Sequence, residues 1–257
     1  MAKTVLVAVL ITLVAAASCL SLSSAAQGEP PVSVRTFLVS FLHALAGDDG
    51  QASRALGWDA SVDPCVWRGV RCDSSRQVLG IFLEGLRGVL DLNGTIDATL
   101  LCAAAPALRV VSLRGNSIRG VLPASIAGCA GLRKLSLRDN QLSGVLPASL
   151  SQLTNLRKLD VSRNSFAGEL PAGLSELRLL AFLANDNRFS GAIPDFDLTK
   201  FAAFNVSNNS LTGPIPRRTG HFGTDSFLPN AAGLCGQPLF APCPISPVPQ
   251  PSYSDEN

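Results

Sequence analysis

The sequence predicts an α/β solenoid, in which coils of similar length stack and each contributes one short parallel strand. Two observations predict it. A phrase of leucines and polar residues recurs five times between residues 108 and 216, and each copy keeps its asparagine, glycine and proline at fixed offsets. A single coil cannot close a core alone, because its apolar side chains lie on one side. Stacked coils bury one continuous core.

The repeated asparagine occurs at steps of 24, 24, 23 and 22 residues, with glycine four residues later and proline three after that. Glycine permits a tight bend, and proline fixes φ where no ladder hydrogen bond is needed. We expect the asparagines to align along one edge of the stack. The sets are Asn116, Asn140, Asn164, Asn187 and Asn209; Gly120, Gly144, Gly168, Gly191 and Gly213; and Pro123, Pro147, Pro171, Pro194 and Pro216. One inward position per strand is shared by Leu113, Leu137, Val161, Ala184 and Val206.

The phrase resembles the leucine-rich repeat, L-x-x-L-x-L-x-x-N-x-L, and the added x-G-x-(L/I)-P resembles its plant-type variant. The resemblance implies a superhelix with short parallel strands on its concave face. It also implies that the asparagine amides bond to the backbone of neighbouring coils, because buried polar groups need partners.

Residues 1–26 are typical of a secretory signal peptide. Lys3 is the positive region, an apolar run follows, and Ser24-Ala25-Ala26 offers a cleavage site that would leave Gln27 first. The alternative is an uncleaved membrane anchor. The rest of the chain has no comparable apolar run, so we expect no internal membrane span. Losing Lys3 lowers the formal net charge from +2 to +1, which gives no global attraction for nucleic acid.

Six of the seven cysteines remain after the signal, and four form close pairs at the two ends of the solenoid. A solenoid exposes its core at both ends and needs caps, and small caps in oxidising compartments are held by disulfides. We predict the disulfides Cys65–Cys72 and Cys235–Cys243. A zinc site is the alternative, but no histidine is near and the spacing is not C-x₂-C. No metal or other cofactor is expected.

Residues 27–77 are expected to form the N-terminal cap. Its first part has apolar residues at helical spacing, including Phe37, Phe41 and Leu45, which predicts an amphipathic helix; His43 among them is interpreted as a packing or surface residue. The motifs that follow are Gly57-Trp58 and Asp63-Pro64-Cys65-x-Trp67-x-Gly69-Val70-x-Cys72. Together they resemble the N-terminal cap of plant leucine-rich-repeat receptor kinases.

Residues 78–216 are expected to hold about six repeats. The first lacks the asparagine and has about six extra residues around Gly85 to Leu90, which predicts a local bulge or loop. Residues 217–243 follow as a C-terminal cap, whose segment Asn230 to Gly236 resembles that of the same receptor kinases. Residues 244–257 are a Pro-rich spacer or tail.

The x positions of L-x-x-L-x-L-x-x-N face the concave surface in leucine-rich repeats, and here they carry eight cations. We call this set the basic patch: Arg109, Arg114, Arg133, Lys134, Arg138, Arg157, Lys158 and Arg163. Only Asp139 and Asp160 interrupt it. Past it, five positions make the surface neutral and partly apolar: Leu180, Ala181, Leu183, Ala202 and Ala203. A basic patch raises the local concentration of anionic partners. The competing interpretation is an ordinary solvated strand surface.

Asn93, Asn205 and Asn208 open N-x-S/T sequences and are predicted glycosylation sites, with Asn205 on the concave face. Cys102 and Cys129 lie in adjacent coils at different repeat offsets. We therefore expect them to be buried free thiols rather than a disulfide.

From residue 32 to residue 243 the chain resembles the ectodomain of a plant receptor-like kinase with few repeats, including kinase-inactive, pollen-type and co-receptor members. The resemblance implies an extracellular recognition module that binds a secreted peptide or another receptor ectodomain, possibly an acidic one in view of the patch. Such receptors continue into a membrane helix and a kinase domain; the kinase motifs do not occur in these 257 residues.

The alternative is a secreted inhibitor of a cell-wall-degrading enzyme, similar to polygalacturonase-inhibiting proteins, although those have about twice as many repeats. An anionic cell-wall polysaccharide is a further candidate ligand. No catalytic residue is expected, because His43 and His221 are the only histidines and no nucleophile–base pair or paired-carboxylate motif is visible. Inhibition of a polygalacturonase would favour the inhibitor, and a downstream membrane helix would favour the receptor.

Overall fold

The computed structural model describes residues 34–47, 50–230 and 233–244. The predicted signal peptide and nearly all of the Pro-rich tail lie outside these residues. The described chain begins with a helical cap, α2 (Val34–Ala46), α3 (Gln51–Leu56) and the 3₁₀ turn η1 (Pro64–Val66), followed by the hairpin β1 (Val70–Cys72) and β2 (Val78–Phe82). The helix α4 (Ala98–Ala104) then leads into the regular coils.

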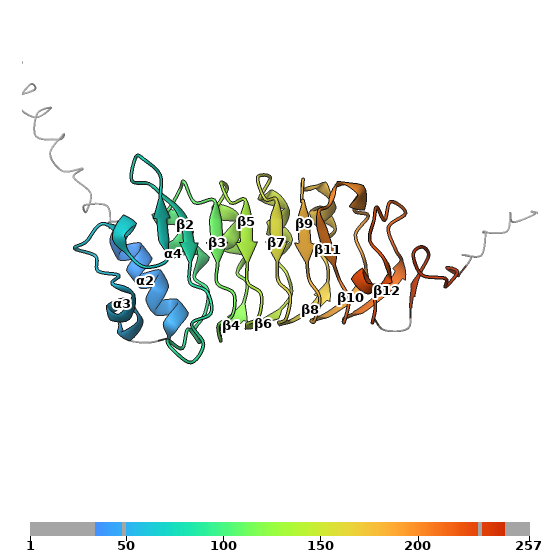
Figure 1. Cartoon of the computed structure of the whole chain (residues 1–257), viewed down its shortest axis with the longest axis horizontal. Coiled ribbons are helices and arrows are strands. Elements are labelled where there is room, and N and C mark those ends of the chain that lie inside the picture. The colour runs from blue at the N-terminus through green and yellow to red at the C-terminus, as the bar shows by residue number, and fades with distance from the viewer. Residues whose placement is uncertain (1–33, 48–49, 231–232, 245–257) are drawn as a thin grey trace, which may run out of the picture. The chain divides into compact units, whose positions relative to one another are not determined.

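One strand from each coil joins a seven-stranded sheet in the order β1-β2-β3-β5-β7-β9-β11 (Figure 1). Its regular members are β3 (Val110–Ser112), β5 (Lys134–Ser136), β7 (Lys158–Asp160), β9 (Ala181–Leu183) and β11 (Ala203–Asn205). From β2 onward every pair is parallel, and equivalent repeat positions lie opposite each other. This sheet forms the predicted concave face, and the predicted solenoid is confirmed.

A second sheet follows the asparagines and uses the later part of each coil (Figure 1). Its strands are β4 (Arg119–Val121), β6 (Gln141–Gly144), β8 (Ser165–Glu169), β10 (Arg188–Ala192), β12 (Ser210–Pro214) and β13 (Leu234–Cys235). The repeat glycines lie in these strands with positive φ. At Gly144, where φ is 75°, an added Cβ would also lie 2.9 Å from a Val121 methyl group, so conformation and space both require glycine.

After α4, the outer side of each regular coil is a short 3₁₀ turn. These turns are η2 (Ala124–Gly128), η3 (Ala148–Gln152), η4 (Ala172–Glu176) and η5 (Leu198–Lys200). A further 3₁₀ turn, η6 (Thr224–Ser226), packs beside β11, where the Val206 amide donates to the Ser226 carbonyl. The first three start directly after a repeat proline, which has no N–H and a φ already suited to the first helical turn. Of the helices in the described part of the chain, none has both the length and the apolarity that a bilayer crossing requires.

Asparagine side chains tie the coils together along one edge, and we call this arrangement the asparagine ladder. Asn164 shows the pattern: its Nδ2 donates to the carbonyls of Leu137 (3.0 Å) and Val161 (3.1 Å), and its Oδ1 accepts from the Leu142 amide (3.0 Å). Asn116, Asn140, Asn187 and Asn209 repeat it. The alignment predicted from the sequence is therefore present.

Asn230 extends the asparagine ladder into the C-terminal cap. Its Nδ2 donates to the Val206 carbonyl at 3.0 Å and its Oδ1 accepts from the Leu211 amide at 2.9 Å. At the other end the first coil has Leu86 in place of asparagine, and the Leu86 amide donates to Oδ1 of Asn116. Arg87, in the expected loop, donates to the carbonyl oxygens of Asn116 and Asp139. The loop thus packs onto the edge that the missing asparagine would have covered.

Both caps contain the expected disulfides, Cys65–Cys72 and Cys235–Cys243. The expectation of free thiols at Cys102 and Cys129 is wrong, because these residues form a third disulfide with a Cα–Cα distance of 4.7 Å. The prediction failed because it compared the two cysteines only by their offsets within the repeat. Cys102 lies in an α-helix, which rises about 1.5 Å per residue, whereas Cys129 follows a 3₁₀ turn, which rises about 2.0 Å. Two cysteines at unequal repeat offsets can therefore lie next to each other on the outer side of the stack.

Candidate functional site

The structure gathers the basic patch on the concave face, on β3, β5 and β7 and the turns around them. Apolar residues of these strands, such as Leu135 and Leu159, point into the core and are buried. The x positions beside them face outward. Lys134 lies directly opposite Lys158 in the parallel register, and neighbouring strands are about 4.8 Å apart. Of the eight cations, Arg109, Arg114, Arg133 and Arg163 are exposed, and the others are half-buried.

Three patch arginines are engaged within the protein. Arg114 pairs with Glu84 at 2.8 Å and Arg163 with Asp186 at 3.8 Å. Arg157 donates to the carbonyls of Thr154 and Leu156, both at 3.1 Å. Within the described residues, the other five cations have no carboxylate oxygen within 4.0 Å: Arg109, Arg133, Lys134, Arg138 and Lys158. Their charges face solvent on one side of the sheet.

The acidic residues near the patch are occupied elsewhere. Asp139 lies 3.7 Å from Arg87 of the first loop, and buried Asp160 accepts a hydrogen bond from the Ser162 hydroxyl at 2.7 Å. Partial burial acts to raise the pKa of Glu84, but the Ser112 hydroxyl, Arg114 and more distant Lys134 outweigh it, so this pKa is lowered. Glu84 is thus an anion that Arg114 already compensates.

Beyond β7 the concave face becomes neutral. Leu180 is 52% exposed, Ala202 is exposed, and Leu183 and Ala203 are half-buried. Asn205 lies here on β11, as predicted, and its Oδ1 accepts from the amide and the hydroxyl of Ser207. The face therefore has two zones, one cationic and one weakly apolar.

A hollow of about 470 Å³, which we call the glycine hollow, lies at the edge of the basic patch and was not predicted from the sequence. Its lining residues are Glu84, Gly85, Arg114, Gly115, Arg138 and Asp139. They occupy the two positions before the ladder position, which is Leu86 in the first coil and asparagine in the next two. The signal was visible in the sequence, since the first two coils read Glu-Gly and Arg-Gly where the third and later coils have a side chain at both positions.

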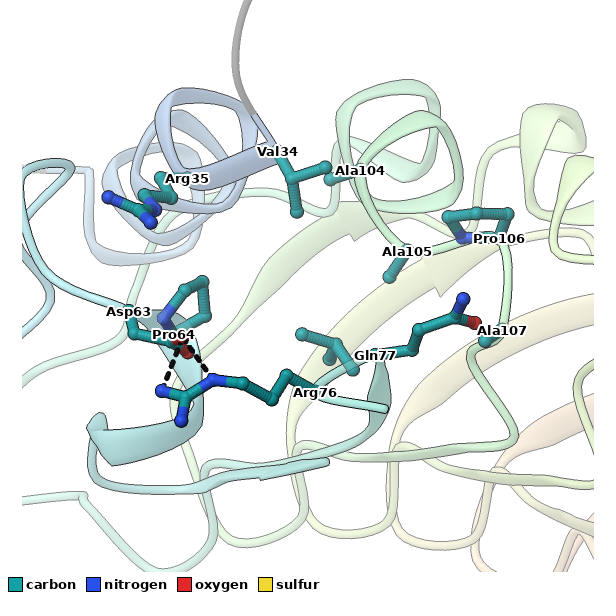
Figure 2. A pocket seen from close by; sticks show the side chains of 11 residues that line it. Val34, Arg35, Asp63, Pro64, Arg76, Gln77, Ala104, Ala105, Pro106 and Ala107 are labelled. Carbon is teal, nitrogen blue, oxygen red and sulfur yellow. Dashed lines mark hydrogen bonds and ion pairs between the residues drawn. The ribbon is translucent and has the colours of Figure 1, made fainter. Parts of the chain in front are cut away.

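A second hollow, of about 340 Å³, lies in the N-terminal cap between α2, η1, the β1–β2 hairpin and the end of α4 (Figure 2). Its walls are mainly alanine, proline and valine. Asp63 accepts from the Cys65 amide at 2.8 Å and from Arg76 Nε at 2.7 Å, and the Cys65 amide first, then Arg76, lowers the pKa of Asp63. Arg35 donates to the Ser61 carbonyl. The charged residues of this hollow thus form hydrogen bonds within the protein, which favours a structural role in the N-terminal cap.

The predicted glycosylation sites differ in their surroundings. Asn93 is half-buried, whereas Asn208 is exposed and its Nδ2 donates to Asp186 at 2.6 Å. Glycosylation at either site stays a prediction. His43 is half-buried on α2, and His221 packs against the Phe222 ring. In the residues that the structure describes, no group of three or more His, Cys, Asp or Glu side chains is arranged to hold a metal ion.

Comparison with known proteins agrees with this architecture. Residues 106–166 match a leucine rich repeat family model, and residues 35–73 match a leucine rich repeat N-terminal domain model. Two probable inactive receptor kinases of Arabidopsis thaliana, one of them RLK902, are each 49% identical over 207 residues, which is 80% of this chain. The chain spans only 29% and 30% of the length of these two relatives.

Among solved structures, a Pollen Receptor Kinase 3 crystal structure is 29% identical with a TM-score of 0.61. The match covers 74% of this chain and 92% of that one. The ectodomain of the Arabidopsis thaliana receptor kinase SOBIR1 is also 29% identical, with a TM-score of 0.58, and covers 73% of this chain and 99% of its own.

Proposed function

Because the chain is a leucine-rich-repeat protein whose homologues are plant receptor-like kinases, we propose that it is an extracellular recognition module of a receptor-like protein or co-receptor. It binds a secreted peptide or another receptor ectodomain through the concave face. The observation that carries this proposal is the group of five cations without carboxylate partners on and beside β3, β5 and β7, among the described residues.

The concave face suits recognition for two reasons. The asparagine ladder and a continuous core hold its strands in a fixed register, so a ligand meets a preorganised surface and little ordering is needed on binding. The five regular strands, about 4.8 Å apart, spread over roughly 20 Å, which is the length of about six residues of an extended peptide. A charged sheet of this kind steers an acidic partner and selects it by charge.

The test reverses the centre of the basic patch by changing Arg133, Lys134, Arg157 and Lys158 to Glu. The glycosylated secreted chain is measured against apoplastic peptides and receptor ectodomains at low and high salt. The wild type should bind an acidic partner with an affinity that falls as salt rises, and the reversed protein should lose at least about tenfold in affinity. A matched control reverses four exposed arginines outside the basic patch, two of them on the second sheet: Arg54, Arg119, Arg188 and Arg217. Unchanged binding by the patch variant would remove the concave cations from the recognition surface.

A further inference from the structure

The residue before each ladder position adopts the left-handed conformation in every coil. Its φ is 58° at Asp139, 55° at Arg163, 57° at Asp186 and 54° at Asn208. The same position is glycine in the first two coils, with φ values of 65° and 72°. Side chains with a Cβ adopt this conformation rarely, although asparagine and aspartate tolerate it best. The backbone turn is therefore constant, and only the side chain at this position varies between coils.

The two glycines create the glycine hollow. In the later coils the row of left-handed residues is filled and cross-linked, because Asp186 pairs with Arg163 at 3.8 Å and accepts from Asn208 at 2.6 Å. Over Gly85 and Gly115 no side chain continues this row, and the space of about 470 Å³ opens toward the concave face. The hollow thus follows from residue choice at one repeat position and requires no change of the backbone path.

The charges around the glycine hollow leave one cation without a counterion. Arg114 holds Glu84 at 2.8 Å, and Arg87 from the neighbouring loop lies 3.7 Å from Asp139. Half-buried Arg138 lines the same hollow, and within the described residues its side chain forms no hydrogen bond or ion pair. A guanidinium group offers planar paired donors that match a carboxylate, so Arg138 is free to receive one.

We propose that the glycine hollow is the subsite for a carboxylate side chain of an extended peptide lying on the concave face, with Arg138 as its principal donor and Arg114 beside it. This rests on the proposed function and adds a ligand class to it. The peptide carries an aspartate or glutamate toward one end and apolar side chains toward the other, where Leu180 and Ala202 present the neutral zone.

The hollow favours a peptide over an anionic polysaccharide. Glu84 and Asp139 line the space, and their carboxylates would repel the closely spaced charges of a polyuronate chain. A single carboxylate can instead meet Arg138 while both acidic residues keep their own arginines. The apolar zone on the next coils also offers contacts that a polysaccharide with a charge on every sugar cannot use.

Selection from a random peptide library against the immobilised secreted chain tests the proposal without a known ligand. Enriched peptides are synthesised with blocked ends and labelled, and Kd is measured by fluorescence anisotropy. We expect aspartate or glutamate at a fixed position among the enriched sequences. Replacing that residue by its amide should weaken binding about tenfold or more, and Arg138→Gln should weaken it by the same factor without an additive effect on the amide peptide.

A second variant fills the space and leaves the cations in place. Gly115→Asn suits a left-handed position, as Asn208 shows, and a Cβ at Gly115 would lie 3.3 Å from the Cα of Gly85, within the hollow. It should also raise Kd about tenfold. Gly57→Asn is the matched control, because Gly57 has a φ of 71°, close to the 72° of Gly115, and lies at the end of α3 outside the lining of the hollow. Arg188→Gln, on β10, is the control for Arg138→Gln. Both controls should leave Kd unchanged.

The outcomes separate the subsite from the broader function. If Arg138→Gln and Gly115→Asn leave Kd within twofold while the four-residue reversal abolishes binding, the concave face binds peptides and the subsite proposal is wrong. If the reversal also has no effect, both proposals fail. If no peptide is enriched, or if an oligogalacturonate binds in an Arg138-dependent way where peptides do not, the peptide assignment is overturned.

Discussion

In the coils of β3, β5 and β7 the concave face is cationic and the core is largely aliphatic. In the coils of β9 and β11 the face is neutral and the core is built from phenylalanine. Around Phe204 the rings of Phe182, Phe196, Phe201, Phe222 and Phe227 all lie with centroids 5.7 to 6.1 Å away. The equivalent buried position in the earlier coils holds Val111, Leu135 and Leu159.

The two regions share one backbone. The asparagine ladder makes the same hydrogen bonds at Asn140 as at Asn209, and the strands keep one register from β3 to β11. Backbone geometry is therefore set by the asparagine, glycine and proline of each coil. The x positions of the strands do not determine the backbone geometry, so their side chains can differ between coils without changing how the coils stack. Recognition can reside in one region while the other serves as scaffold.

Core filling differs because the coils shorten. The step between ladder asparagines falls to 22 residues in the last repeat, and its outer turn η5 has three residues where η2 has five. Fewer residues must fill the same cross-section, and aromatic side chains supply the missing volume. Interiors are close-packed, so a shorter coil with only leucines would leave voids.

The largest expected effect concerns this core. Phe204→Ala should destabilise the protein by about 3–5 kcal/mol, because five neighbouring rings cannot all close on the space left. Leu159→Ala, at the same repeat position, should cost less, about 2–3 kcal/mol. Urea unfolding followed by circular dichroism measures both. An equal or smaller loss for Phe204→Ala would show that the aromatic region repacks more easily than the aliphatic one.

The asparagine ladder should respond alike in both regions. Asn164→Ala and Asn187→Ala each remove the partner of one amide and a donor to three carbonyls, so each should cost about 2–3 kcal/mol. The same unfolding measurement applies, and we expect the two losses to agree within about 0.5 kcal/mol. Asn155→Ala is the control, since this exposed side chain makes one bond to the Ala130 carbonyl. Clearly unequal losses would contradict a common backbone mechanism.

The sequence was sufficient for the features that repeat. Strand positions and the asparagine ladder follow from residues at fixed offsets, because each such residue meets the same surroundings in every coil. Both cap disulfides were also predicted, because the cysteines of each pair lie close together in the sequence. Features that depend on unequal coils were not accessible in this way. The Cys102–Cys129 disulfide pairs an α-helix with a 3₁₀ turn, so repeat offsets gave the wrong relative height.

In the candidate site, too, the features that repeat between coils could be predicted and the irregular ones could not. The basic patch could be read from the x positions, since parallel register brings equal positions together. Which cations form ion pairs could not be predicted, because Arg87 contacts Asp139 from an irregular loop and Glu84 lies in the irregular first coil. The place of Asn230 in the asparagine ladder was likewise not predicted, since Asn230 lies outside the repeat motif, in the C-terminal cap, and is recognised by its bonds to Val206 and Leu211.

The smallest expected effect is on the acid stability of the outer turn η5, which begins differently from the outer turns of the cationic region. The turns η2, η3 and η4 follow a proline, whereas η5 follows Asp197. The Thr199 hydroxyl first, then Lys200 and Arg218, lower the pKa of Asp197 to about 2. The stabilisation is therefore complete above the ordinary aspartate pKa near 4 and is lost as pH falls from about 4 toward 2.

Asp197→Asn should remove this part of the acid dependence. Thermal unfolding between pH 5 and pH 2 should show a shallower fall of Tm for the variant than for the wild type, with a slight loss at neutral pH because surface pairs contribute little. Asp195→Asn, a neighbouring exposed residue, is the control and should keep the wild-type slope. If Asp197→Asn also keeps that slope, the turn η5 owes its stability to the packing of Leu198 and Phe201, and both regions then fix their outer turns in the same way.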